Sequence, residues 1–418
     1  MMSETTPSPQ KIFLWNILGS LSTAAISVLL LLVVSRTLTD FEADIFSIAY
    51  AIGNLFVVIG LFQVRNFQST DMQPKYTFNE YFVARLLSCL GMAIAVCIYI
   101  WIKGYEGYKA VIILIICLYR LTDALSDVFQ GLFQQKQRLD IASKSLVYRN
   151  AMIFLSFTLV TYMTRNLILS LVIVCIVSIT CILSFDLLKI RFFETICIKG
   201  QSLSRVKDLL QENIPLFLNG FLLVYIYNQP KYSLDKLLET GQVAEGSQKL
   251  FNILFMPVFV LNLTMLFLRP LITEMALHYS KRNMIAYNSL KNRIFAVLGI
   301  FSIFILVMSY FLGIPVLGFV YGTKLQAYQQ AFMILMIGGV FSSFSSVFDN
   351  IITVLRKQHW LVLAHIFAFV VSALISDSLV SIYGILGASY SFLLSMISWL
   401  LSLIAIYIFI TRKEQMSE

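Results

Sequence analysis

Long apolar runs separated by short polar stretches recur along the whole chain. Because the bilayer core is roughly 30 Å thick, one helical crossing needs about 20 apolar residues. The runs therefore predict about twelve membrane-spanning helices. We expect these spans at 13–38, 43–64, 80–103, 109–133, 143–164, 167–189, 212–230, 247–269, 288–311, 326–355, 359–382 and 384–410.

Two stretches need a separate interpretation. The apolar run Ile12–Val34 is too long for the core of a signal peptide, so we interpret it as the first membrane helix. The stretch 313–321 contains Gly313 and Pro315, and we expect a short excursion at the outer surface there. Neither stretch changes the predicted class, an all-α polytopic membrane protein.

The composition supports this class. Of the 418 residues, 59% are hydrophobic and 13% are charged, and the mean hydropathy is +0.82. Soluble domains are usually about half apolar and about a quarter charged. The spans use most of the chain and leave only short loops, so we expect no soluble domain.

The basic residues predict the orientation. With the N-terminus inside, 21 Lys and Arg residues lie at inner loops and span ends, and 8 lie on the outer side. This positive-inside bias predicts that both termini lie in the cytoplasm. The net charge of +9 does not indicate nucleic acid as a partner, since no basic helix with stacking aromatics lies outside the spans.

A short motif recurs in the two halves of the chain. Ser126–Gln130 in the fourth span resembles Ser345–Asp349 in the tenth, 219 residues later. Six crossings separate the two copies, which favours two six-helix bundles with a parallel internal repeat, although chance similarity is the alternative. The predicted domains are 1–190, a cytoplasmic linker at 191–211, and 212–418.

Arg120 is the most informative charged residue, because it lies in the middle of a predicted span. A charge at the bilayer centre costs about 2.5–3.5 kcal/mol on insertion scales, so it is kept only inside a bundle or a wet cavity. Asp123 and Asp127 follow on the same helical face. A cavity role and a neutralising ion pair within the helix are both open interpretations.

Further cations are expected at the ends of the cleft between the bundles. Arg36 ends the first span, and Lys231 ends the seventh between Asn228 and Asp235. These two spans hold equivalent places in the two bundles. The alternative is that both side chains extend to the outer interface, as most Lys and Arg residues at helix ends do.

A second group of cations lies toward the inner leaflet. Arg65 and Gln68 are one turn apart at the end of the second span, and Arg85 and Arg149 lie about two turns inside the third and fifth. Together they could form a basic inner vestibule for a diphosphate, since Arg offers planar bidentate donors. The alternative is topological charge with salt-bridge partners.

Nothing in the sequence indicates a metal or a cofactor. The three histidines have no metal-ligand spacing. There is also no GxxxxGK[ST] loop for nucleotide hydrolysis.

Several segments resemble the Wzx-type polysaccharide flippases of the multidrug/oligosaccharidyl-lipid/polysaccharide exporter superfamily. The resemblance runs along essentially the whole chain, and each segment stands in the family's order. The segments are Asn16–Ala49, Val64–Asp71, Asp127–Gly131, Pro230–Lys236, and Phe255–Pro257 leading to Arg269–Leu271.

The resemblance implies two six-helix bundles around a central cationic cavity. It also implies that the protein flips undecaprenyl-diphosphate-linked oligosaccharide, of capsule, O-antigen or teichoic-acid type, from the inner to the outer leaflet by alternating access. By this analogy five cations meet the phosphates and sugars, and Asn16 gives polar support. These cations are Arg36, Arg65, Arg120, Arg149 and Lys231.

Two departures from the family pattern matter. Thr39 stands where many relatives have glycine, which puts the tightness of that turn in question. The first span has no Asp or Glu, whereas drug-exporting relatives often use an acid there for ion coupling. This second departure argues against drug antiport.

Two other functions stay open. One is an ion-coupled drug or metabolite exporter of the same fold. The other is a membrane-embedded glycan polymerase or acyltransferase, which the short, histidine-free loop 231–246 disfavours. We therefore expect a non-enzyme whose partners are the lipid-linked oligosaccharide, membrane lipids, and a glycan polymerase or glycosyltransferases.

Overall fold

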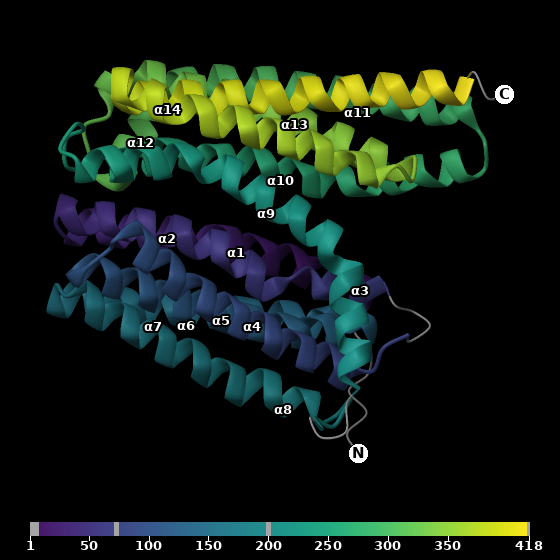
Figure 1. The fold of residues 1–418 in the computed structure, drawn as a ribbon, viewed down its shortest axis with the longest axis horizontal. Coiled ribbons are helices and arrows are strands. Elements are labelled where there is room, and N and C mark those ends of the chain that lie inside the picture. The colour runs from purple at the N-terminus through teal and green to yellow at the C-terminus, as the bar shows by residue number, and fades with distance from the viewer. Residues whose placement is uncertain (1–7, 71–74, 198–201, 416–418) are drawn as a thin grey trace. The chain divides into compact units, whose positions relative to one another are not determined.

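The computed structural model describes residues 8–70, 75–197 and 202–415, and these residues are helical with no strand (Figure 1). The chain divides into two compact units, Met1–Phe221 and Leu222–Glu418. The boundary lies inside one helix, α9 (Leu203–Glu239). The predicted linker includes residues 198–201, which lie outside the described residues, as does Asp71 of the family-like segments. The predicted domain limits stay predictions.

The N-terminal unit is built around α5. This helix contacts α2, α3, α4, α6 and α7, while α1 packs mainly against α6. The helices are α1 (Pro9–Thr37), α2 (Asp40–Leu61), α3 (Val64–Thr70), α4 (Phe78–Lys103), α5 (Gly107–Gln135), α6 (Leu139–Thr164), α7 (Leu167–Cys181), the π-helical turn η1 (Ile182–Asp186) and α8 (Leu187–Ile190). Polar residues on α5 are therefore surrounded by protein on most sides.

Threonine caps fix where two of these helices begin. The Thr39 hydroxyl accepts a hydrogen bond from the backbone N–H of Glu42, and the Glu42 carboxylate accepts one from the Thr39 N–H, each at 3.2 Å. Thr77 and Glu80 form the same capping box at the start of α4. Such a cap contributes about 1 kcal/mol. Thr39 thus gives the turn before α2 a defined helix start where relatives have glycine.

The C-terminal unit is organised around α13, which contacts α10, α11 and α14. Besides the second half of α9, it contains α10 (Ser247–Ser280), α11 (Met284–Met308), the π-helical turn η2 (Ser309–Gly313), α12 (Ile314–Tyr321), η3 (Gln326–Tyr328), α13 (Gln329–Val354), η4 (Gln358–Trp360) and α14 (Leu361–Gln415). Gly384, with φ 56° and ψ −128°, divides α14 into two helices. Only glycine adopts such a backbone readily.

The described residues form twelve crossings. Nine helices are long and apolar enough to cross a membrane, and one of them, Gln358–Lys413, contains two helices that meet at Gly384, which makes ten crossings. Adding α5 makes eleven; this helix is less apolar because its middle carries Arg120, Asp123 and Asp127. The twelfth is α10, part of which is described by its backbone alone. Six crossings precede α9 and six begin with it, which confirms the predicted all-α polytopic fold.

The stretch 313–321 is helical, and its place at the outer surface stays a prediction. The segment is α12, which continues α11 through η2, so that one helical path runs from Met284 to Tyr321. Pro315 lies in the first turn of α12. Within this continuous path the proline removes one backbone hydrogen bond, and the π-helical turn η2 directly before it marks the local distortion of the helix.

Candidate functional site

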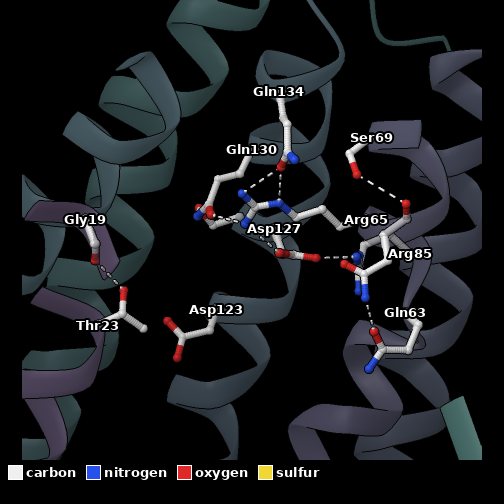
Figure 2. Close-up of polar contacts among 12 residues, drawn as sticks. Gly19, Thr23, Gln63, Arg65, Ser69, Arg85, Asp123, Asp127, Gln130 and Gln134 are labelled. Carbon is white, nitrogen blue, oxygen red and sulfur yellow. Dashed lines mark hydrogen bonds and ion pairs between the residues drawn. The ribbon is translucent and has the colours of Figure 1, made fainter. Parts of the chain in front are cut away.

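The acidic residues of α5 form two separate clusters in the N-terminal unit. We call Arg65, Arg85 and Asp127 the Asp127 cluster, and Arg120, Asp123 and Arg149 the Asp123 cluster. Asp127 faces α3 and α4, and Asp123 faces α6. In Figure 2, Asp123 lies one turn along α5 from Asp127 and away from the residues that contact Asp127.

In the Asp127 cluster, one carboxylate binds two guanidinium groups. Asp127 Oδ1 lies 3.2 Å from Arg65 Nη1, and Oδ2 lies 2.7 Å from Arg85 Nη2 (Figure 2). Arg85 Nη1 also donates to the Gly60 carbonyl at 2.6 Å. The Arg85 side chain is 0% exposed, whereas that of Arg65 is 26% exposed. The cluster therefore ties α2, α3 and α4 to α5.

Two glutamines that the sequence analysis did not identify orient Arg65. Gln130 Oε1 accepts from Arg65 Nη1 at 2.8 Å, and Gln134 Oε1 accepts from Nε and Nη2 at 3.3 and 3.2 Å. Their spacing of three and seven residues after Asp127 puts them on its face of the helix, a signal that was available in the sequence. All three Arg65 nitrogens are thus hydrogen bonded.

Gln68 does not join Arg65, although the two were predicted together. Its side chain is 0% exposed, and its amide oxygen and nitrogen have no hydrogen-bond partner among the described residues. It packs against Gly131, where an added Cβ would lie 2.2 Å from the Gln68 oxygen. Gln68 therefore fills the contact between α3 and α5, and only glycine leaves room for it.

The Asp123 cluster is less completely paired. Arg120 Nη1 donates to Asp123 Oδ2 at 2.5 Å, and Arg149 Nη2 forms an ion pair with Oδ1 at 2.7 Å. Three buried nitrogens, Arg120 Nε and Arg149 Nε and Nη1, have no hydrogen-bond partner among the described residues. A buried donor left unpaired costs about 1–3 kcal/mol. Two cations and one anion give the cluster a formal charge of +1 and spare donors for an acidic ligand.

The predicted helical ion pair is thus present, but only in part. Arg120 pairs with Asp123, three residues on, and its guanidinium also lies 5.6 Å from the centre of the Tyr50 ring. Asp127 shares the helical face but binds Arg65 and Arg85 instead. The ion-pair interpretation therefore accounts for one of the two acids.

Asp186 is a buried acid beside α5 that the sequence analysis missed. It is 1% exposed and accepts hydrogen bonds from Ser126 at 2.6 Å and Ser145 at 2.5 Å. It ends the π-helical turn η1, whose wider turn keeps Asp186 facing α5. Gln130 donates to Ser126 at 3.1 Å, which links this acid to the Asp127 cluster. An acid inside the predicted span 167–189 was the available signal.

Other predicted residues lie outside both clusters. Arg36 is exposed in the last turn of α1, and Asn16 is half-buried in its first half. Twenty residues of helix place them about 30 Å apart. They cannot both lie beside one small ligand group.

Lys231 belongs to the C-terminal unit. Its side chain is buried on α9, and its ammonium lies 4.7 Å from the centre of the Phe255 ring. Asn228 and Asp235, on the same face of α9, are also buried. Asn228 Nδ2 donates to the Val224 carbonyl at 2.8 Å. Asn228, Lys231 and Asp235 are thus all buried along one face of α9, and a shared polar site stays a prediction.

Twelve apolar helices in two units, with two arginine clusters around α5, define a multi-pass membrane protein. Known proteins with this fold include a transporter and a flippase. No family model matches the chain.

Two solved structures share the fold at low identity. An inward-facing multidrug resistance MATE family transporter of the MOP superfamily matches with a TM-score of 0.71 at 12% identity, covering 94% of this chain and 96% of that one. The lipid II flippase MurJ, in an inward closed conformation, matches with a TM-score of 0.70 at 14% identity, covering 94% and 87%. The first is a transporter and the second a flippase.

A curated relative matches along its whole length. The capsular polysaccharide biosynthesis protein CapF of Staphylococcus aureus is 24% identical over 412 residues, which cover 96% of this chain and 98% of CapF. The likenesses confirm the resemblance found in the sequence: the chain has the fold of the exporter superfamily to which Wzx-type flippases belong.

Proposed function

We propose that this protein flips undecaprenyl-diphosphate-linked oligosaccharide from the inner to the outer leaflet by alternating access. The diphosphate–sugar head enters an opening of the protein while the polyprenyl tail stays in lipid. Cationic side chains then balance the charge of the head, which otherwise could not cross the apolar core without a large desolvation cost.

The observation that carries the proposal is the incomplete pairing of the Asp123 cluster. Arg120 and Arg149 share one carboxylate, and three of their buried nitrogens lack an acceptor among the described residues. A phosphate offers several acceptor oxygens, and charge-assisted hydrogen bonds from Arg to phosphate are among the strongest in proteins. An entering diphosphate would use these donors.

The relatives support the class of substrate. MurJ is a lipid II flippase, and CapF takes part in capsular polysaccharide biosynthesis. A lipid-linked oligosaccharide of capsule type combines the two. The proposed partners are the enzymes that make and consume such a substrate, glycosyltransferases and a glycan polymerase. The proposed location is the bacterial inner membrane, with both termini cytoplasmic.

A second candidate is an ion-coupled drug or metabolite exporter, which the similarity to a MATE transporter favours. The charge of the two clusters argues against organic cations, since each combines two guanidinium groups with one carboxylate. Ion-dependent efflux of a small organic cation from proteoliposomes, with no movement of lipid-linked glycan, would favour this candidate.

The test follows lipid-linked glycan across the bilayer. In cells depleted of the protein, the glycan should accumulate on the inner leaflet, whereas an unchanged distribution contradicts the proposal. In proteoliposomes, Arg120→Gln should lower the flipping rate about tenfold or more, because a charge-assisted contact is lost. Asp123 keeps its contact with Arg149 in this variant, so folding should be retained. Arg412→Gln, an exposed control, should flip as the wild type does.

A further inference from the structure

The C-terminal unit holds a buried cation in an aromatic environment. Lys231 is 4% exposed, and its ammonium lies 4.7 Å from the centre of the Phe255 ring and 5.9 Å from that of Phe259. Phe255 is buried, whereas Phe259 is 36% exposed. Of the two rings beside the ammonium, that of Phe259 is therefore partly accessible from outside the protein.

No acid among the described residues pairs with this ammonium. Lys231 has neither an ion pair nor a hydrogen bond with them, and its ammonium lies against the two ring faces. The four guanidinium groups of the Asp127 and Asp123 clusters differ, because each lies beside a carboxylate. A buried ammonium with three donors and no acceptor is costly to keep, which points to an acceptor that comes from outside the chain.

An unpaired amide lies on the same side of α10. Gln248 is 1% exposed, and its oxygen and nitrogen have no hydrogen-bond partner among the described residues. Seven residues, or two helical turns, separate it from Phe255, so the two share a face about 10 Å apart along the axis. Rings with a few fixed polar groups are typical of small-molecule sites.

We propose that Lys231, Phe255, Phe259 and Gln248 bind an acidic sugar of the transported glycan, with the sugar carboxylate on the Lys231 ammonium. This inference rests on the proposed function and names the substrate more closely. The single charge of the Lys231 ammonium is balanced by one carboxylate, whereas a diphosphate carries two or more negative charges and matches the paired arginines of the N-terminal unit. The rings offer a surface on which the C–H face of a sugar ring can stack, and Gln248 offers a donor and an acceptor for hydroxyl groups.

The test measures binding to the purified full chain in phosphatidylcholine nanodiscs. Three probes are compared: undecaprenyl diphosphate alone, the same lipid carrying a hexose disaccharide, and its counterpart ending in a hexuronic acid. The wild type should bind the acidic probe about tenfold more tightly than the neutral one, as expected for one charge-assisted hydrogen bond. Lys231→Met should abolish this preference without changing the affinity for undecaprenyl diphosphate.

Control variants separate the charge from the fold. Lys231→Arg keeps the charge and should keep most of the preference. Lys236→Met removes a lysine on the same helix whose side chain is 63% exposed and paired with Asp377, and should leave the preference unchanged. If Lys231→Met does not fold, Lys231→Gln takes its place, and size-exclusion profiles establish which variants are intact.

The outcomes distinguish this inference from the proposed function. Equal binding of the acidic and neutral probes by the wild type overturns the acidic-sugar site but leaves the flippase proposal standing. If the Lys231→Met variant still prefers the acidic probe over the neutral one, the acidic-sugar site is likewise overturned and the flippase proposal stands. Loss of the preference when phosphatidylglycerol is added to the nanodiscs assigns the site to a lipid headgroup and also overturns the inference. Failure of the wild type to bind any polyprenyl diphosphate overturns both proposals.

Discussion

The two helices that carry the internal repeat, α5 and α13, are each central to their unit but pack by different means. α5 carries the half-buried residues Arg120, Asp123 and Asp127, and the two acids hold neighbouring helices through ion pairs. α13 has one charged residue, Asp349, which forms no ion pair within the described part of the chain. Similar positions in a repeat therefore do not imply similar chemistry.

Small residues take the place of charges in α13. Ser343 and Ser345 are 0% exposed, and their hydroxyls bond to carbonyls of their own helix four residues earlier. Gly338 and Gly339 allow close approach, since a Cβ at either would come within 2.8 Å of a neighbouring side chain. Such packing is common between membrane helices. α13 thus packs through small residues, whereas α5 holds its neighbours through ion pairs, and anion binding by α5 belongs to the proposed function.

The largest effect should come from removing the shared acid of α5. Asp127→Ala leaves the fully buried Arg85 guanidinium without its counter-charge. Breaking such a buried pair costs about 3–5 kcal/mol, so the variant should unfold at a much lower temperature or fail to accumulate. Thermal unfolding in detergent measures this. Asp349→Asn, the control in α13, should have little effect, and equal effects would remove the contrast between the two helices.

A smaller loss is expected from crowding α13. Gly338→Ala places a methyl group 2.7 Å from the Phe392 ring, and overpacking of this kind costs about 1–3 kcal/mol. Gly91→Ala in α4 is the matched control, because nothing lies within 4 Å of its added Cβ. The unfolding midpoint should fall for the first variant and hold or rise for the second. A tolerated Gly338→Ala would show that α13 is not packed as tightly as described.

The smallest effect is expected from an exposed ion pair of the N-terminal unit. Lys75 donates to the Glu212 carboxylate at 2.5 Å, and this hydrogen bond raises the pKa of the Lys75 ammonium. The contribution of this pair to the free energy of unfolding is therefore fully present below the ordinary lysine pKa, about 10.4. It is lost as the pH rises through the raised pKa of Lys75.

Surface pairs of this kind contribute little. Lys75→Gln should therefore lower the unfolding midpoint only slightly at neutral pH, and the difference from the wild type should vanish in strong alkali. A fall in the unfolding midpoint as large as that of Asp127→Ala would contradict this expectation, because the Lys75–Glu212 pair would then contribute as much as a buried ion pair.

The spans and the polar face of α5 could be predicted from the sequence, because both depend on spacing along a single helix. The kink at Gly384 falls at the first residue of the expected span 384–410, next to the end of the span 359–382. The Arg120–Asp123 pair follows from a separation of three residues. The continuation of α11 into α12 was missed because Gly313 and Pro315 are usual turn residues, whereas here the π-helical turn η2 carries the helix past them.

The partners of Asp127 could not be predicted in this way. Arg65 and Arg85 lie 62 and 42 residues away from it and reach it only through the packing of α3 and α4 on α5. The pairing of Asp186 with Ser126 and Ser145 likewise depends on three helices meeting. Spacing along one helix cannot show which side chains of other helices will face it.

The sharing of one carboxylate by Arg65 and Arg85 also limits how the chain can change over generations. If Asp127 is lost, replacing Arg85 alone still leaves Arg65 without its acid, and replacing Arg65 alone leaves the more deeply buried Arg85 uncompensated. Recovery from such a loss takes two further substitutions, so revertant screens starting from an Asp127 variant should return the original codon far more often than a second-site suppressor.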